Sequence, residues 1–219
     1  MSLFIFSLLI ILALEGISFS VTAVLECSGR AKVSPGGRLL HRHDMADYVC
    51  IFLNKIATVF FTITVLRDLY FSKATPGIAT LGNVLLPIPQ LFLIYDAMYA
   101  PFHFFLHWTP VYPYIHKHHH RQVAPHRGLE DAVNTHPFEY AVGMWMHLWA
   151  LQLVRDTGGV SVSPWAVLIF IFGGSLLAAF NHTRVEVSLP YVFNSLDHDT
   201  HHRFQRYNYA QVRGGTLYI

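Results

Sequence analysis

One histidine-rich stretch, residues 95–137, decides the fold, and it reads YDAMYAPFHFFLHWTPVYPYIHKHHHRQVAPHRGLEDAVNTHP. It holds an HxxxH motif and an HxxHH motif, and a second HxxHH motif follows near the C-terminus. The eight histidines of these three motifs are His103, His107, His116, His119, His120, His198, His201 and His202. Positions i, i+3 and i+4 share one face of a helix, so each motif can direct its imidazoles at one point. Imidazole is the commonest protein ligand for transition metals, and this spacing therefore predicts a metal site.

The composition is that of a membrane protein. Hydrophobic residues make up 53% of the 219 residues and charged residues 13%, and the mean hydropathy is +0.37. A formal net charge of +2, without a basic tract among aromatic residues, argues against nucleic-acid binding. The two cysteines, Cys27 and Cys50, are too few for a disulfide framework, so we expect free thiols.

Three apolar runs before the second histidine motif are long enough to cross a bilayer, which takes about 20 residues of helix. The first run lacks the positive start and the cleavage site of a secretory signal, so it is expected to remain as a transmembrane helix. Glu15 lies within this run, where a carboxylate is costly unless it faces protein or water. The three spans are expected at about residues 2–25, 47–69 and 78–102.

Polar residues and prolines constrain how these spans pack. Asn54 and Lys55 lie in the second span and must face other helices or lie near an interface. Pro87 and Pro89 are expected to kink the third span. The polar segment between the first two spans, residues 26–46, contains proline and glycine and is predicted to be a loop.

Two further apolar segments, residues 138–154 and 164–180, separate the two HxxHH motifs. The first is short for a full crossing, so the pair is predicted to enter the membrane and return as a helical hairpin. The whole chain is then an all-α, integral membrane helical bundle with about four to five membrane helices. Residues 1–89 would supply the N-terminal membrane helices and their connecting loop. Residues 90–219 would form the histidine-box catalytic region, which includes the hairpin.

This topology places all three histidine motifs on one side of the membrane, together with the loop after the first span. Eleven basic residues fall on that side: Arg30, Lys32, Arg38, Arg42, Lys117, Arg121, Arg127, Arg184, Arg203, Arg206 and Arg213. Three fall on the opposite side: Arg67, Lys73 and Arg155. By the positive-inside rule, the histidines form a cytosolic cap and the N-terminus is lumenal. The glycosylation sequon at Asn181 would then be unused.

Two more histidines are candidate ligands. His182 forms an i, i+4 pair with Glu186, and His136 precedes Pro137, so His136 either binds metal or caps the next helix. Ten histidines exceed the four ligands of a structural zinc site and suit two metal ions with open positions. Neutral imidazoles leave the charge of the ions uncompensated, and carboxylates that hydrogen-bond to ligands are expected to balance it. The candidates are Asp96, Glu139, Glu186, Asp197 and Asp199.

The remaining histidines are predicted to lie outside the site. His118 falls off the ligand face and His126 lies in a loop, so both are expected to meet solvent. His147 lies among Trp and Met residues and is predicted to pack in the core. His41 and His43 have no partner at i+3 or i+4 and are not assigned to the site.

These motifs together resemble the fatty acid hydroxylase and sterol desaturase superfamily, whose members carry HxxxH, HxxHH and HxxHH boxes around a di-iron centre. The pattern is closest to the C4-methylsterol oxidase branch, and the resemblance covers roughly residues 90–212. It rests on Asp96 ahead of HFFLH, on HKHHH, on THPFE at 135–139, on NHTRVE at 181–186 and on DHDTHHRFQRYNYA at 197–210. Phe104 and Glu186 depart from it, since many relatives have arginine and some have histidine at these positions. The departures leave the ligands intact and the substrate open.

The resemblance implies a membrane-bound non-haem di-iron oxygenase, an oxidoreductase of the monooxygenase type. Such an enzyme hydroxylates or further oxidises a C–H bond of a sterol, terpenoid, fatty-acyl or other lipid-like substrate, using O2 and two electrons. Two Fe ions would be the cofactors, although Zn can fill imidazole sites in purified protein. The resemblance also implies cytochrome b5 and its reductase as electron donors, and a place in the endoplasmic reticulum membrane.

Two other functions are compatible with the motifs. The same di-metal scaffold can catalyse a lyase, isomerase or dehydratase reaction, with the metals as Lewis acids and no need for oxygen. A metal transporter is the remote alternative, because transport calls for ligands along a path through the membrane and these motifs fall outside the expected spans.

Overall fold

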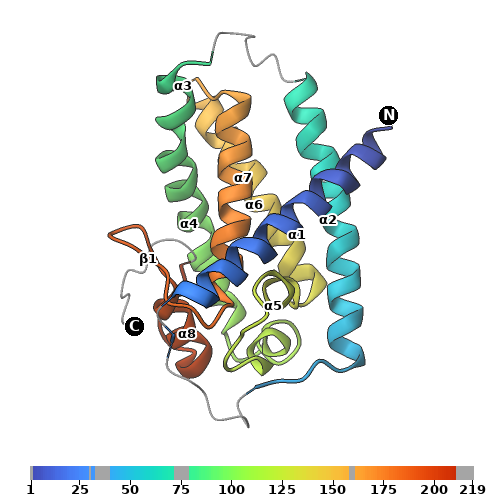
Figure 1. The fold of residues 1–219 in the computed structure, drawn as a ribbon, viewed down its shortest axis with the longest axis vertical. Helices are drawn as coiled ribbons and strands as arrows, with labels where there is room; N and C mark the ends of the chain where they lie inside the picture. Colours follow the sequence, from blue (N-terminus) through green and yellow to red (C-terminus); the bar gives the residue numbers. More distant parts are fainter. Residues whose placement is uncertain (1, 30, 33–39, 72–78, 158–160, 211–219) are drawn as a thin grey trace.

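The computed structural model describes residues 2–29, 31–32, 40–71, 79–157 and 161–210, and most of them are helical (Figure 1). The helices are α1 (Leu3–Ser28), α2 (Met45–Phe71), α3 (Leu81–Leu85), α4 (Pro87–Leu106), the 3-10 helix η2 (His116–Arg121), α5 (Leu129–Val133), α6 (Pro137–Asp156), α7 (Pro164–Asn181) and α8 (Ser195–Phe204). Two short strands, β1 (Ser188–Leu189) and β2 (Phe193–Asn194), pair antiparallel between α7 and α8. The predicted all-α fold is confirmed.

Four helical segments among the described residues are long and apolar enough to cross a membrane. They are Leu3–Cys27, Met45–Tyr70, Leu81–Leu106 and Pro164–Asn181. Large apolar side chains point outward from them, such as Phe19 of α1, which is 77% exposed. Many exposed apolar side chains on segments of this length indicate contact with lipid. The segments agree with the predicted membrane bundle.

The third membrane segment is broken where the sequence predicts a kink. Helix α3 ends at Leu85, and α4 starts at Pro87. Proline has no backbone N–H to donate and its ring fixes φ, so it starts a new helix more readily than it continues one. Pro89 falls in the first turn of α4, where an N–H would have no partner within the helix.

Helices α6 and α7 cover the two segments expected to form the hairpin, and both of them pack against α4. Helix α6 has 20 residues, which at about 1.5 Å per residue would span a bilayer core of about 30 Å. It is less apolar than the four membrane segments because it carries polar residues, including Glu139 at one end and Arg155 at the other. Arg155 Nη1 lies 2.8 Å from an oxygen of Asp68 on α2 and ties the far end of the hairpin to the bundle. Residues 158–160 of the predicted turn lie outside the described residues.

The core lies between α2, α4, α6 and α7. Helix α4 packs against both α6 and α7, and Leu91 and Tyr95 of α4 are 0% and 3% exposed. His147 of α6 lies in this core, as predicted, with its ring centroid 4.2 Å from that of Tyr95 and 5.1 Å from that of Phe170. Helix α1 crosses the bundle obliquely and contacts α2, α5 and α7 (Figure 1).

Partners hold three polar residues inside the first two spans, namely Asn54, Glu15 and Lys55. Asn54 is fully buried, and its Nδ2 donates to the backbone oxygens of Val133 and Thr135, at 2.8 and 2.9 Å, so it faces protein as expected. Glu15 of α1 pairs with Lys55 of α2 at 3.1 Å. These contacts hold α1 and the region of α5 against α2, which is the helix they share.

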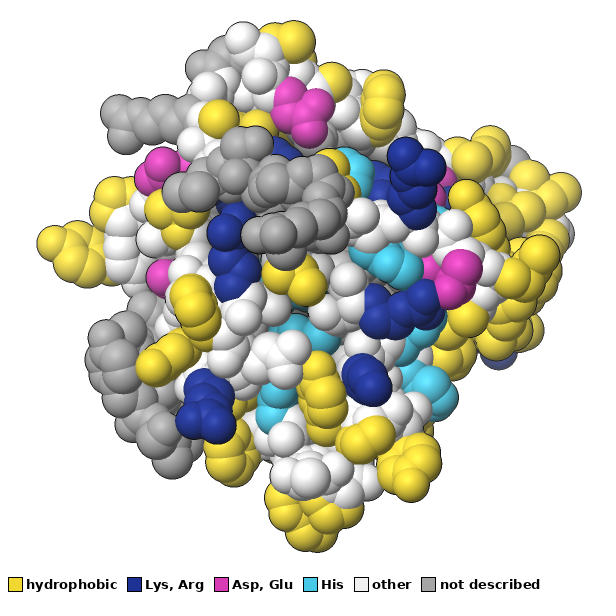
Figure 2. Space-filling model, turned by 90° about the horizontal axis from the view of Figure 1, so that it is seen from below, with side chains coloured by type: hydrophobic (Ala, Val, Ile, Leu, Met, Phe, Trp, Pro, Cys, Tyr) yellow, Lys and Arg dark blue, Asp and Glu magenta, His cyan; other side chains and the backbone are white. Residues whose placement is uncertain are grey.

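The histidine motifs gather at one end of the bundle, with η2, α5 and α8 (Figure 1). Seen from this end, Lys, Arg and His side chains are spread over the surface (Figure 2). Arg30, Arg38, Lys73 and Arg213 of the charge comparison lie outside the described residues. Residues 30 and 33–39 of the predicted loop at 26–46 also lie outside the described residues. The helices on either side of the loop end at Ser28 and begin at Met45. Cys27 and Cys50 are free, as expected.

Candidate metal centre

Nine of the ten candidate histidines form two compact groups of possible metal ligands. The five-histidine group consists of His103, His107, His116, His120 and His201, and the four-histidine group of His119, His182, His198 and His202. Within each group the ligand nitrogens all lie within 4.8 Å of one another. The tenth candidate, His136, caps α6 instead, since its Nδ1 accepts the backbone N–H of Phe138 at 3.2 Å.

Each HxxHH motif is divided between the two groups, so the prediction that each motif aims at one point is wrong. In α8, His198 and His202 belong to the four-histidine group and His201 to the five-histidine group. The residues at i+3 and i+4 project about 100° apart around a helix, on opposite sides of residue i. A helix that lies between two sites therefore serves both. In η2, likewise, His119 belongs to the four-histidine group, whereas His116 and His120 belong to the five-histidine group.

The Nε2 atoms within each group have the spacing of ligands around one ion. In the five-histidine group, Nε2 of His116 lies 2.9 Å from that of His103 and 3.0 Å from that of His120. In the four-histidine group, Nε2 of His198 lies 3.2 Å from that of His182 and 3.0 Å from that of His202. Two nitrogens bound at right angles, each about 2.1 Å from a metal such as zinc, would be separated by about 3.0 Å.

The tautomers show that these short distances are not hydrogen bonds. In the five-histidine group, Nδ1 of His103 faces the carbonyl oxygen of Tyr209 at 2.9 Å, and Nδ1 of His116 faces Oε1 of Glu139 at 2.9 Å. Each acceptor requires a proton on Nδ1, so Nε2 of a neutral ring carries a lone pair. Two lone pairs 2.9 Å apart repel each other unless a cation lies between them. The donor set therefore fits a metal ion.

The four-histidine group is oriented in the same way. Nδ1 of His182 donates to the carbonyl oxygen of Ala178 at 2.7 Å, and Nδ1 of His119 to that of Asn134 at 3.3 Å. Their Nε2 atoms, 3.3 Å apart, then both present lone pairs. A carbonyl or carboxylate that accepts the second N–H of an imidazole fixes its orientation for a metal.

Burial keeps the histidines in the form that binds metal. It lowers the pKa of His116 and of His119 from 6.5 to about 3, and that of His182 to about 4. The rings are neutral near pH 7, and a neutral ring needs to release no proton from Nε2 to bind an ion.

The candidate carboxylates take different places. Glu139 is 5% exposed and bonds His116 directly, as described above. Asp199 is buried and bonds Arg184 and Arg203, the latter at 3.0 Å. The others lie outside the two groups: Asp96 is buried on α4, and Glu186 and Asp197 are half-buried.

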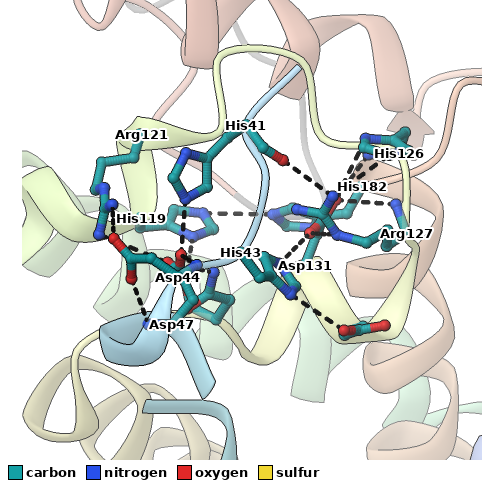
Figure 3. Close-up of polar contacts among 12 residues, drawn as sticks. His41, His43, Asp44, Asp47, His119, Arg121, His126, Arg127, Asp131 and His182 are labelled. Carbon is teal, nitrogen blue, oxygen red and sulfur yellow. Dashed lines mark hydrogen bonds and ion pairs between the residues drawn. The ribbon is translucent and has the colours of Figure 1, made fainter. Parts of the chain in front are cut away.

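A pair of fully buried aspartates, Asp47 and Asp131, supports the four-histidine group from outside (Figure 3). We call this pair the carboxylate clamp. Oδ1 of Asp47 accepts Nδ2–H of Asn134 at 3.0 Å, and the carbonyl of Asn134 is the one that His119 bonds. The clamp thus reaches a candidate ligand through one residue.

Asp131 acts on another ligand of the same group. Its Oδ2 accepts the backbone N–H groups of His126 and Arg127 at 2.8 and 2.9 Å, which orders the turn before α5. Gly128 in this turn has φ +59°, a conformation that favours glycine, and its N–H donates to the carbonyl of His182 at 3.0 Å. Burial alone would raise the pKa of Asp131, but these donors and the Arg127 guanidinium outweigh it and lower that pKa.

Sequence reasoning missed this clamp. His41 bonds Asp47 at 2.7 Å, and His43 lies 3.3 Å from Asp131, although neither histidine was assigned a role. His118 was expected to meet solvent, which is wrong: it is half-buried, with Nε2 2.8 Å from Oδ1 of Asn134. The signal in the sequence that could indicate the clamp is the acidic Asp47 at the start of the second span.

An apolar cavity of about 190 Å³ borders both histidine groups. His103 lines it from the five-histidine group, and His119, His182 and His198 line it from the four-histidine group. The rest of its wall comes mainly from α2, α4, α6 and α7, with Leu14 of α1. A second, open hollow of about 760 Å³ reaches His107 from another side and is lined by Trp108, Tyr112, Arg203 and Arg206 among others.

Fold and site together define a class of protein: a helical membrane protein with two histidine groups that can hold metal ions beside an apolar cavity. The chain belongs to the fatty acid hydroxylase family, whose family model matches residues 88–215, more than half of its length. No curated protein and no solved structure is significantly similar to it. Family membership confirms the resemblance at the level of the superfamily, and it makes a metal-dependent oxidoreductase the expected kind of enzyme.

Proposed function

We propose that this protein is a membrane-bound non-haem di-iron oxygenase that hydroxylates or further oxidises a C–H bond of a lipid-like molecule, using O2 and two electrons. The observation that carries the proposal is the position of one apolar cavity against both histidine groups. Apolar pockets with a few convergent polar groups are the usual form of small-molecule sites. A substrate in this cavity lies next to both groups of ligands.

Each part of the site has a task in this proposal. When bound, iron supplies the activation of O2 and the removal of hydrogen from an unactivated C–H bond. The nine imidazoles would hold the ions through neutral nitrogens, and backbone carbonyls orient four of the rings, those of His103, His119, His182 and His201. The apolar lining from α4, α6 and α7 excludes water and orients the substrate.

The setting of the enzyme follows from charge and hydropathy. We propose a cytosolic position for the histidine end because basic side chains lie on this face (Figure 2), and the endoplasmic reticulum membrane because of the family resemblance. Electrons would come from cytochrome b5 and its reductase. The open hollow at His107, with Arg203 and Arg206 in its wall, supports a contact with a negatively charged donor at this face. The C4-methylsterol oxidase branch remains a proposal for the substrate, beside terpenoid and fatty-acyl lipids.

Metal content and oxygen uptake test the proposal directly. Protein purified without oxygen is expected to hold about two irons per chain and to consume O2 when given reductant and a lipid extract. His119→Ala removes a ligand of the four-histidine group, so we expect it to lose iron and turnover. Lys117→Ala is the matched control, because Lys117 lies in the same 3-10 helix as His119 but is exposed and belongs to neither group.

The outcomes separate the alternatives. Oxygen uptake that survives in His119→Ala, or protein that takes up no iron, would refute the oxygenase. Turnover of a lipid without O2 or reductant would favour a lyase, isomerase or dehydratase with the metals as Lewis acids. Metal uptake by proteoliposomes would favour a transporter. Zinc in purified protein leaves the proposal intact, because imidazole sites bind zinc more tightly than iron.

A further inference from the structure

The two short strands between α7 and α8 form a β-hairpin whose tip is apolar. The β-hairpin tip consists of residues 189–192, with the sequence LPYV, and it carries no charge. All four side chains are exposed, Leu189 to 49%, Val192 to 51% and Tyr191 to 101%. Scattered exposed apolar residues are common on protein surfaces, but a contiguous group of them at the end of a projecting β-hairpin marks a contact surface.

The turn in this tip holds a tyrosine in a backbone conformation that tyrosine disfavours. The N–H of Val192 donates to the carbonyl oxygen of Leu189 at 3.0 Å, so Pro190 and Tyr191 are the two central residues of the turn. Proline followed by a residue with positive φ is the pattern of a type II turn, in which the second position normally holds glycine or asparagine. Tyr191 has φ +64° there, and its fully exposed ring packs against nothing in the described part of the chain. The strain points to a contact of this ring with something other than its own chain.

The β-hairpin tip lies at the depth of the membrane surface. It projects sideways from the bundle, level with the lower part of α4 and on the membrane side of α8 (Figure 1). The membrane segment that contains α4 ends at Leu106, and Phe105 and Trp108 at this end are 45% and 59% exposed. Exposed aromatic side chains at the end of a membrane span are typical of the headgroup region, where tyrosine is enriched as well. The tip therefore continues the lipid-facing surface of the bundle.

We propose that the β-hairpin tip inserts into the headgroup region of the surrounding bilayer and ties α8 to the membrane surface. The side chains of Leu189 and Val192 would be removed from water there, and the ring of Tyr191 would lie among lipid with its hydroxyl among the headgroups. A soluble protein and a second copy of this chain are the competing occupants. The bilayer is favoured over both because the tip is uncharged and lies at the depth where the lipid-facing surface ends.

The base of the β-hairpin is joined rigidly to α8. Strand β2 ends at Asn194 and α8 starts at the next residue, and Oδ1 of Asn194 accepts the backbone N–H of Leu196 at 3.0 Å as the helix cap. Ser195 is fully buried, its N–H donates to the carbonyl oxygen of Val187 at 3.0 Å, and its Oγ accepts the N–H of Val187 at 3.0 Å. A tip fixed in the headgroup region therefore fixes the start of α8. This helix carries three candidate metal ligands, His198, His201 and His202.

A spin label in the tip tests its environment in the full-length protein, reconstituted in phosphatidylcholine nanodiscs. Cys27→Ser and Cys50→Ser remove the native thiols, and Val192→Cys carries the label. Leu93→Cys, 59% exposed on α4, is the reference for lipid, and Lys117→Cys, exposed on η2, is the reference for water. Dioxygen concentrates in lipid and a neutral nickel chelate stays in water, so the ratio of their collision rates with the label reports depth. We expect this ratio to be at least threefold higher at Val192→Cys than at Lys117→Cys.

Tyr191→Asn separates lipid contact from the shape of the turn. Asparagine adopts a positive φ more readily than tyrosine, so the β-hairpin should keep its conformation while the tip loses its aromatic ring. The collision ratio at Val192→Cys should then fall by at least twofold. Tyr114→Asn is the matched control, because it removes another exposed tyrosine at the histidine end and leaves the tip unchanged.

Hydrogen exchange tests the tie between the tip and α8. In nanodiscs, Tyr191→Asn combined with Val192→Thr, which keeps the branched shape of valine, should speed exchange of the α8 amides at least threefold and leave those of α7 unchanged. Unchanged exchange in α8 would overturn the tie to this helix.

Two results with the spin label would overturn membrane insertion. A collision ratio at Val192→Cys equal to that at Lys117→Cys would place the tip in water. Collision rates that are low for both dioxygen and the nickel chelate would mean that protein covers the tip, as a second copy of the chain would. Neither measurement depends on metal or turnover, so both outcomes are distinct from failure of the oxygenase.

Discussion

Replacing Asp47 of the carboxylate clamp should weaken metal binding in one histidine group and spare the other. In Asp47→Asn, one of the two carboxylate oxygens becomes an NH2 group. Asp47 now accepts Nδ2–H of Asn134 at 3.0 Å with Oδ1 and the backbone N–H of Asp44 at 2.7 Å with Oδ2. One of these donors would face the new NH2 group, and a donor facing a donor repels it. Asn134, which orients His119 through its carbonyl, would shift.

The expected loss of metal affinity follows from how directly the changed residue orients the ligand. Groups that orient a metal-binding histidine are worth roughly 10- to 100-fold in metal affinity, which is about 1.4 to 2.7 kcal/mol. This loss applies to the four-histidine group, which contains His119. The five-histidine group takes its Nδ1 acceptors from Tyr207, Tyr209 and Glu139, which Asp47 does not contact. Its affinity should change by less than about threefold.

A titration of metal-free protein with Co²⁺, in competition with a chelator of known affinity, measures the two sites separately. We expect two binding steps in the wild type and a shift of the weaker or stronger step alone in Asp47→Asn. Asp68→Asn is the control, because it breaks the pair with Arg155 at the far end of the bundle. Equal weakening of both sites would refute the reasoning, since it would show a general loss of stability. Unchanged binding at both sites would refute it as well.

Three further predictions follow from burial and close packing. Metal-free protein should lose stability as the pH falls from 6.5 toward 3, because the unfolded chain then binds protons that the folded chain does not. Each histidine such as His116, whose pKa burial lowers to about 3, should cost about 1.4 kcal/mol per pH unit. A flat melting temperature over this pH range would contradict the prediction. Gly174→Ala should cost roughly 1 to 3 kcal/mol in thermal unfolding, since its Cβ would lie 2.9 Å from Nε2 of His147, whereas Gly16→Ala, with open space around its Cβ, should not destabilise the protein. Lys32→Met should raise the melting temperature more at pH 6 than at pH 10, because burial lowers the pKa of Lys32 to about 7 and the cost of the buried ammonium is complete below that pH; an equal gain at both would exclude this cause.

The sequence predicts the fold well because hydropathy and proline act locally. Spans of about 20 apolar residues must be helical in lipid, since every backbone group needs a partner within its own segment. The break before Pro87 and the burial of Asn54 follow from the same local rules. Hydropathy alone predicts too short a span for α6, because this helix is long enough to cross the membrane while its polar residues lower its hydropathy.

The pairing of histidines into sites needs three-dimensional information. Spacing predicts which imidazoles share a helix face, and so it identifies the ligands as candidates. It cannot tell whether a helix lies against one site or between two. His198 and His201 are three residues apart but belong to different groups, because α8 lies between the two groups. The orientation of the rings cannot be predicted from the sequence either, since the acceptors of His103 and His201 are backbone carbonyls, which every residue has.

The carboxylates that balance the charge of the centre are also hard to predict from sequence, for a physical reason. Nine neutral imidazoles would leave the charge of bound divalent ions uncompensated, so negative charge is expected nearby. Among the carboxylates near the motifs in sequence, Glu139 contacts the five-histidine group through His116, whereas Asp199 is already neutralised by two arginines. Around the four-histidine group, buried negative charge comes from the carboxylate clamp, and Asp47 lies 87 residues from the Asn134 through which it acts. A buried carboxylate is stable only where donors converge on it. Such donors come together when the start of α2 packs against the region of α5, so the clamp exists only in the folded protein.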